Sequence, residues 1–208
     1  MTKNLYDLWD EGWKPKKGKT FYFGNYHGDI KWIVLNVEDD RMLAISKNVL
    51  DWLPFDENGN NDWQNCSLRK WLNEVFANEA LCDGENIEDY WIFDKAETGE
   101  FVSLLNYSMA EELYDLLNRH GSPPSTFLEL LHNPDFYGNW YELGNLSFWL
   151  IPENGKFTYV DAYGDSSTIS DTEDDQEWME ENRVDNDFSK PLGVRPILWL
   201  KSDPDLYG

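Results

Sequence analysis

Two cysteines are the side chains of this sequence with the greatest nucleophilic potential. Cys66 directly precedes an expected helix. Because a helix N-terminus can lower the pKa of a thiol, Cys66 is the better candidate for a reactive group. Cys66 and Cys82 form no C-x-x-C pair, and a metal site would need further ligands at a suitable spacing. We expect two ordinary thiols of a reducing compartment, with Cys66 buried and structural, while a disulfide between them stays open.

The other residue types that support catalysis show no selective pattern. The three histidines are scattered, and the sequence contains no H-E-x-x-H, phosphate-binding loop or dinucleotide fingerprint. The polar loop of residues 56–62 carries oxygen-bearing side chains, but Asn61 and Ser67 stand where a calcium loop needs Gly and Glu. We therefore predict no catalytic residue, no cofactor and no metal. With 40 acidic residues, a hydrolase that uses some carboxylate pair stays an alternative.

Two arginines stand inside apolar motifs. Arg69 lies within S-L-R-K-W-L, and Arg195 lies within G-V-R-P-I-L-W-L. We expect each guanidinium group to have a structural role, paired with buried carboxylates or backbone carbonyls. The functional alternative is that both line an anion-binding pocket.

Aromatic side chains are the main candidates for ligand contacts. They make up 16% of the residues, with eleven each of Trp, Tyr and Phe. Most will fill the core, but exposed rings serve recognition well. The candidates that stand in or beside polar, glycine-containing loops are Trp63, Tyr137, Trp140, Tyr141 and Tyr163.

The net charge of −23 restricts the class of partner. A chain this acidic repels phosphate backbones and anionic membrane surfaces, so we expect neither a nucleic acid nor a membrane as partner. Much of the charge lies in the segment 165–187, which lacks regular apolar spacing and is expected to be a mobile surface loop. An acidic inhibitor or DNA mimic that acts on a basic partner through this loop is an alternative function.

The clearest structural signal is a helix in W-Q-N-C-S-L-R-K-W-L-N-E-V-F. A spacing of i, i+3, i+4, i+7 and i+8 places five apolar residues on one face of an α-helix; they are Leu68, Trp71, Leu72, Val75 and Phe76. A capping box at Ser108 and Glu111 predicts a second helix over residues 109–119.

Strands are expected on both sides of these helices. Three strands, over residues 20–26, 30–37 and 41–47, have connections too short for a crossover, so they form an antiparallel meander. Further strands are expected at 101–105, 146–151, 156–162 and 193–200. Strands at both ends that enclose helices indicate an α+β fold. We expect a lead-in of residues 1–17, with a short helical turn, and one domain over residues 18–208.

No apolar segment approaches the length of a membrane span, and the N-terminal residues have no apolar signal region. A soluble, cytoplasmic protein is therefore expected, while release by a phage stays open.

Several of these motifs together resemble a bacterial and phage domain family of unknown function. Its members carry W-x-x-S-x-L-R-x-W-L-N-x-x-F in the middle and G-V-R-P-A-L-W-L at the end. The matching residues include Leu68, Arg69, Trp71 and Leu72 in the helix and Gly193, Arg195 and Pro196 near the end. The order of elements is similar to that of C-type-lectin-like and formylglycine-generating-enzyme-like domains. The resemblance implies a lectin-like fold, and with it a recognition module that binds a protein or a glycan.

Overall fold

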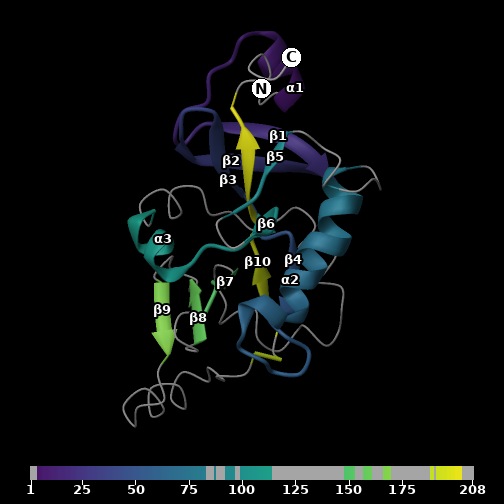
Figure 1. Cartoon of the computed structure of the whole chain (residues 1–208), viewed down its shortest axis with the longest axis vertical. Coiled ribbons are helices and arrows are strands. Elements are labelled where there is room, and N and C mark those ends of the chain that lie inside the picture. Colours follow the sequence, from purple (N-terminus) through teal and green to yellow (C-terminus); the bar gives the residue numbers. More distant parts are fainter. Residues whose placement is uncertain are drawn as a thin grey trace. The chain divides into compact units, whose positions relative to one another are not determined.

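The computed structural model describes residues 4–82, 87, 92–96, 99–113, 148–152, 157–160, 166–169, 188–189 and 191–202 (Figure 1). They group into two compact units. The first unit takes its residues from 1–50, 71–103 and 195–208, and the second takes its residues from 51–70 and 104–194. Both units combine a sheet with helical segments, so the predicted α+β fold is confirmed. The C-type-lectin-like architecture and the assignment of 18–208 to one domain stay predictions.

The first unit contains an antiparallel sheet with the strand order β1-β2-β3-β11-β5, and β6 also pairs with β11. The strands are β1 (Thr20–Asn25), β2 (Asp29–Val37), β3 (Arg41–Ser46), β5 (Phe93–Asp94), β6 (Val102–Ser103) and β11 (Ile197–Lys201). The predicted meander of the first three strands is confirmed. The last strand joins β3 in the register Leu198 to Ala44, so segments from both ends of the chain share this sheet.

Two patterns of side-chain burial explain how these strands form: alternate positions are buried in β1, and consecutive positions are buried in β2. Phe21 and Phe23 of β1 are buried at every second position, which is typical of a strand with one covered face. In β2 the run from Trp32 to Leu35 is fully buried. The indole Nε1 of Trp32 donates a hydrogen bond of 2.8 Å to the carbonyl oxygen of Phe23, so the polar atom of this buried ring is satisfied. The lead-in contains α1 (Leu5–Asp10), as predicted, and Asn4 caps it.

The predicted central helix differs from an ordinary α-helix. A 3₁₀ turn, η1 (Trp63–Asn65), precedes α2 (Ser67–Trp71), and the π-helix η2 (Leu72–Leu81) follows. A π-helix has i→i+5 hydrogen bonds, so residues four, five and nine apart share a face. The buried residues of η2 have this spacing: Leu72, Phe76, Ala77, Ala80 and Leu81. The prediction that Val75 belongs to the buried face is wrong, because the wider turn rotates it outward and leaves it 40% exposed.

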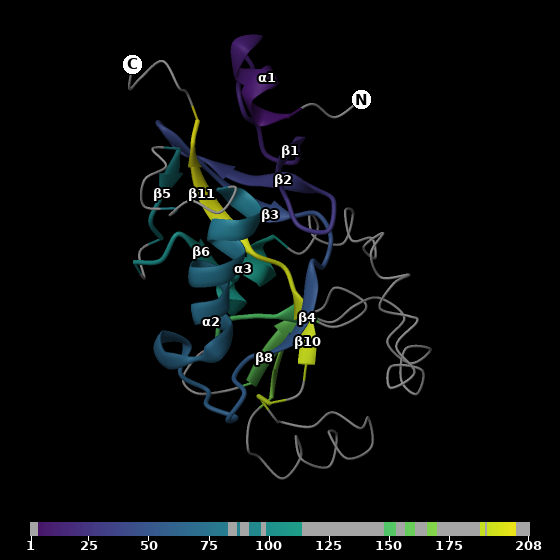
Figure 2. The same cartoon turned by 90° about the vertical axis from the view of Figure 1, so that its right-hand side faces the viewer.

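The π-helix lies against the first sheet at two points. It contacts β1 and β6, and Figure 2 shows the coil beside β6. At β1 the approach is so close that a Cβ atom on Gly24 would lie 2.6 Å from the carbonyl oxygen of Ala80. At β6 the side chain of Asn73 takes the place of a neighbouring strand. Its Oδ1 accepts hydrogen bonds from the backbone N–H groups of Phe101 (3.1 Å) and Val102 (3.0 Å), and its Nδ2 donates to Val102 (2.8 Å).

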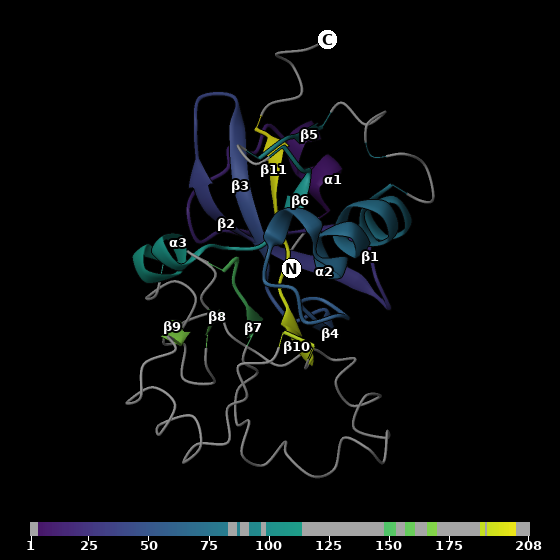
Figure 3. The same ribbon diagram turned by 60° about the horizontal axis from the view of Figure 1, so that its bottom comes forward.

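The second unit contains a mixed sheet with the strand order β4-β10-β7-β8-β9. The strands are β4 (Asp51–Pro54), β7 (Phe148–Trp149), β8 (Phe157–Val160), β9 (Ser166–Ile169) and β10 (Pro191–Val194). β10 pairs antiparallel with β4, and Figure 3 shows these two strands side by side. It pairs parallel with β7 through Gly193 and Phe148.

Two strand predictions need correction in this unit. The expected strand over 193–200 is two strands, β10 and β11, separated by Arg195 and Pro196. Proline has no N–H group to donate to a ladder, so it interrupts the pairing at this point. Residues 166–169, expected within a mobile acidic loop, form β9 and pair with β8.

The second predicted helix begins earlier than expected. It is α3 (Tyr107–Glu112), and Asn106 is its N-cap, because the Asn106 side chain accepts a hydrogen bond from the N–H of Met109. Residues 114–120, over which this helix was expected to continue, lie outside the described residues. Residues 135–145, which include the candidate rings of Tyr137, Trp140 and Tyr141, also lie outside the described residues, as does most of the acidic segment. Within the described part of the chain, no helix has the length and apolar character that a membrane crossing requires.

Candidate functional site

Of the five aromatic residues predicted to contact a ligand, Trp63 is the one that the structure describes. Trp63, expected among exposed rings, is 5% exposed, so it is not available to a partner. It packs on Phe55, which also contacts Trp149 and Phe188 with ring centroids 5.4 Å away in each case. These four rings form a buried cluster in the second unit, and the indole of Trp149 donates a hydrogen bond to the backbone oxygen of Leu53. The other candidates, Tyr137, Trp140, Tyr141 and Tyr163, lie outside the described residues.

The loop that superficially resembles a calcium site is organised by one buried carboxylate. Asp56 accepts hydrogen bonds from the backbone N–H groups of Asn58, Asn60 and Ser67, at 2.9, 3.1 and 2.9 Å. Burial raises the pKa of Asp56, but these three donors outweigh it, and the net effect is a lowered pKa. The carboxylate therefore caps α2 and closes the loop. Across the described residues, no three His, Cys, Asp or Glu side chains gather as a metal site would need.

The two cysteines form no disulfide, and both are buried. Burial raises the pKa of Cys66 to about 11, and the Asp56 carboxylate adds to this effect, whereas hydrogen bonds from backbone N–H groups oppose it. Its Sγ lies 3.4 Å from the backbone oxygen of Trp63 and 3.4 Å from the nitrogen of Arg69. A thiol that stays protonated at neutral pH is a poor nucleophile, so this environment suits a structural residue.

Arg195 is held inside the first unit by backbone oxygens. Its Nε and Nη2 atoms donate hydrogen bonds to the carbonyl oxygen of Ser46 at 3.2 and 3.0 Å, and Nη2 also donates to that of Lys47 at 3.2 Å. Burial lowers the pKa of Arg195 to about 10, so the guanidinium remains charged at neutral pH. Ser46 also donates its N–H to the oxygen of Pro196. The arginine therefore fastens the end of β3 to the chain just before β11.

The other residues of the sequence motifs have similar local roles. Leu68 and Leu72 are buried, and Gly193 and Pro196 are buried too. Arg69 is half-buried, and its Nη1 donates to the backbone oxygen of Gln64.

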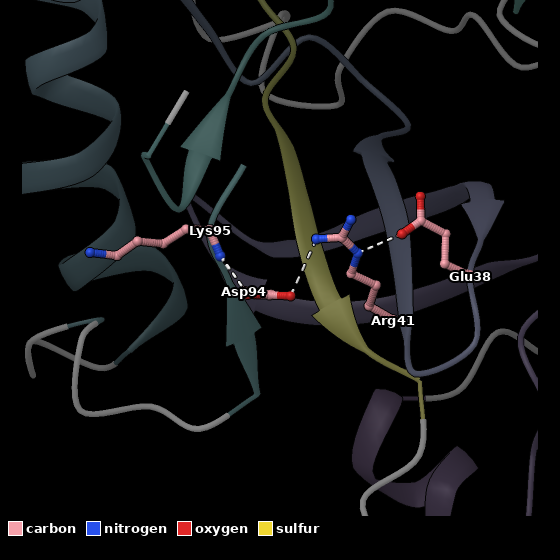
Figure 4. A network of polar contacts seen from close by, with 4 residues as sticks. All are labelled: Glu38, Arg41, Asp94 and Lys95. Atoms are coloured by element: carbon pink, nitrogen blue, oxygen red, sulfur yellow. Dashed lines mark hydrogen bonds and ion pairs between the residues drawn. The ribbon is translucent and has the colours of Figure 1, made fainter. Parts of the chain in front are cut away.

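A second arginine forms a polar network at the surface of the first sheet (Figure 4). Arg41 pairs with the carboxylates of Glu38 at 2.6 Å and Asp94 at 3.4 Å. Its guanidinium carbon lies 4.2 Å from the ring centroid of Trp199. Arg41 therefore joins three strands: it lies in β3, contacts the Trp199 ring of β11 through a cation–π interaction, and pairs with Asp94 of β5.

Among the aromatic side chains that reach the surface of the first unit, three lie together, and we call Tyr26, His27 and Trp71 the aromatic corner. Tyr26 and Trp71 are half-buried, and His27 is exposed. The rings of Tyr26 and Trp71 meet at 81°, with their centroids 6.0 Å apart. Trp71 stacks on the buried ring of Phe76 at 5.5 Å, and Tyr26 meets the same ring edge-on at 5.5 Å. Phe76 therefore supports both partly exposed rings from below.

The turn that carries this corner is conformationally strained. His27 has φ +52, and it is the one residue other than glycine with a positive φ in the described part of the chain. The turn is closed by a hydrogen bond from the N–H of Tyr26 to the oxygen of Gly28. His27 lies against Tyr26 with a centroid distance of 4.4 Å. Strained residues cluster at ligand-binding and other functional sites, which motivates a functional interpretation of this turn.

Sequence reasoning missed this site because neither ring carries an obvious signal. Trp71 falls on the apolar face of the predicted helix, and Tyr26 ends an expected strand, so both were assigned to packing. The one available signal was the His27–Gly28–Asp29 turn directly after an aromatic strand.

Comparisons of this chain with models of protein families, with curated protein sequences and with solved structures found no significant match. The resemblance to the domain family of unknown function therefore stays a prediction.

Proposed function

We propose that this protein is a recognition module that binds a protein or glycan partner through the aromatic corner. The carrying observation is the pair of partly exposed rings, Tyr26 and Trp71, set at 81° beside a strained exposed residue. Tyrosine and tryptophan offer a large contact area at a low cost in side-chain entropy, and they dominate the energetics of recognition surfaces.

The support beneath the corner favours binding over a purely structural role. Phe76 is fully buried and contacts both rings, so they are already oriented before a partner arrives. Such preorganisation reduces the ordering cost of association. The π-helix that begins beside Trp71 adds to this argument, since π-helical geometry is often found at functional sites.

We place this module in the cytoplasm as part of the same proposal. Cys66 and Cys82 are buried and form no disulfide with each other, which agrees with a reducing compartment.

The experiment compares two tyrosine variants on one panel of immobilised ligands. The panel contains neutral and acidic glycans and short peptides of positive, neutral and negative charge. Tyr26→Ala removes one ring of the corner. Tyr22→Ala is the matched control, because Tyr22 is a half-buried tyrosine of β1, the strand that ends just before Tyr26, and its ring lies instead beside Lys31.

We expect at least one ligand that binds the unmodified protein and the Tyr22→Ala variant alike, and binds the Tyr26→Ala variant about tenfold more weakly, as for an interfacial hot spot. Circular dichroism confirms that each variant is folded. A panel on which no ligand depends on Tyr26 would refute the proposal.

A further inference from the structure

We propose that the aromatic corner binds an arginine side chain of a basic partner protein. This inference rests on the proposed function and names the chemistry of its partner. Three observations carry it: the orientation of the rings, the charge around them, and a second site in the same unit that already holds an arginine in this way.

The first observation is the arrangement of the two rings. The faces of aromatic rings carry negative potential, so a cation placed over them is attracted. The planes of Tyr26 and Trp71 lie nearly at right angles, at 81°. A flat guanidinium group can stack on one such face while its edge approaches the other ring.

The second observation is the charge around the rings. Asp29 is exposed and lies two residues beyond His27, where the turn ends and β2 begins. Two carboxylates of the π-helix that follows Trp71, Glu74 and Glu79, are exposed as well. With a net charge of −23, the chain attracts cations and gains no electrostatic advantage from a neutral sugar.

The third observation is the site of Arg41. There a guanidinium contacts the carboxylates of Glu38 and Asp94 (Figure 4). The same guanidinium lies 4.2 Å from the Trp199 ring centroid. The aromatic corner offers related components, a half-buried indole and, two residues beyond His27, the exposed Asp29, whose carboxylate accepts a hydrogen bond from Asn25. An arginine from a partner would reproduce there the contacts that Arg41 makes within the chain.

The experiment uses two labelled octapeptides, four Gly-Arg repeats and the same peptide with citrulline in place of each arginine. Citrulline keeps the shape of the side chain and removes its charge. Binding to the full chain is measured by fluorescence anisotropy at low and high salt. In addition, the indole N–H resonance of Trp71 is followed by NMR during the titration.

Two variants separate the aromatic contribution from diffuse charge. Tyr26→Leu keeps an apolar side chain against Phe76 but removes the ring, and it leaves the net charge unchanged; Tyr22→Leu is its control. Asp29→Asn removes one charge beside the corner. Asp39→Asn is its control, because Asp39 is also an exposed aspartate of a hairpin turn but lies at the other end of β2.

We expect the arginine peptide to bind at least fivefold more tightly than the citrulline peptide and to shift the Trp71 resonance. Tyr26→Leu should weaken this binding about fivefold. Asp29→Asn should weaken it about threefold at low salt, and high salt should reduce this effect. The two control variants should bind like the unmodified protein.

Equal binding of both peptides would overturn the inference. So would equal binding of the Tyr26→Leu and Tyr22→Leu variants, which would show that diffuse charge alone attracts the peptide. If the panel instead yields a neutral glycan whose binding depends on Tyr26, the inference fails while the proposed function stands. If no ligand of any class depends on Tyr26, both fail.

Discussion

Replacing Gly24 by alanine tests whether β1 and the π-helix pack as closely as the structure shows. A Cβ atom at this position would lie 2.6 Å from the backbone oxygen of Ala80 and 2.8 Å from Cδ2 of Leu81. The leucine side chain has freedom to move, but the carbonyl group belongs to the helix and does not. Gly24 also has φ +73, a conformation that is unfavourable for a residue with a side chain.

Gly12 separates these two effects, because it has nearly the same φ of +71 but no atom within 4 Å of the position that a Cβ would take. Gly12→Ala should therefore show the conformational cost alone, about 1–2 kcal/mol of unfolding free energy. Gly24→Ala should show this cost and an overpacking cost of about 1–3 kcal/mol.

Urea unfolding followed by circular dichroism measures the difference. With a slope of about 2 kcal/mol per molar urea, the extra cost at Gly24 corresponds to a midpoint lower by about 0.5–1.5 M than that of Gly12→Ala. Equal midpoints for the two variants would refute the close packing of β1 on the helix. They would also weaken the case for the aromatic corner, because this packing brings Tyr26 to Trp71.

Three further predictions concern buried polar groups. Asn73→Leu removes three hydrogen bonds to the backbone of Phe101 and Val102. It should lower the unfolding free energy, measured by urea titration, by about 2–4 kcal/mol. Asn36→Leu, at an exposed strand position, is the control and should have little effect. Cys66 should react with a thiol reagent at pH 8 only after unfolding. Because burial raises its pKa from 9.0 to about 11, the stability that the protonated thiol contributes is present below pH 9 and is lost as pH rises toward 11. A Cys66→Ala variant should lack this loss of stability. The lowered pKa of Asp56 stabilises the folded state above pH 3.8 and this contribution is lost as pH falls further, so the urea midpoint of the unmodified protein should fall more steeply in acid than that of Asp56→Asn. Rapid native-state labelling of Cys66, or equal acid profiles for the last pair, would contradict the corresponding prediction.

The strands of the first unit could be predicted because their signals are local. Aromatic and β-branched residues alternate or run continuously, and short polar turns join them, so the meander of β1, β2 and β3 follows from neighbouring residues alone. The pairing of β11 with β3 depends on contacts across most of the chain, and no local pattern predicts it.

The division of the last expected strand shows a different limit. Apolar residues dominate from Val194 through Leu200, so hydropathy alone predicts one strand. Pro196 was a local reason to expect a break, but the sequence does not show which strands the segments before and after it pair with. β10 pairs with β4 and β7, and β11 pairs with β3, β5 and β6.

The helix prediction failed where it assumed a turn of 3.6 residues. That period places Val75 with Leu72 and Phe76, but the π-helix replaces it with a wider turn and selects Ala77, Ala80 and Leu81 instead. The choice between the two geometries depends on tertiary contacts, such as the approach of β1 and the hydrogen bonds of Asn73. Neither contact is visible in the helix sequence itself.

The position of Trp71 connects the helix to the proposed function. Hydrophobic periodicity cannot distinguish a ring with two buried faces from a ring with one, because both contribute an aromatic residue to the same pattern. Trp71 has one face stacked on buried Phe76 and remains partly exposed beside Tyr26. From the sequence, ligand contacts are assigned to rings in or beside polar loops and Trp71 to packing, whereas the proposed function gives Trp71 both roles. In the proposed function the same indole packs the helix and contacts the partner, so a substitution at Trp71 should change stability and recognition together. Tyr26→Leu and Asp29→Asn keep the stacking of Trp71 on Phe76, so they should change recognition more than stability.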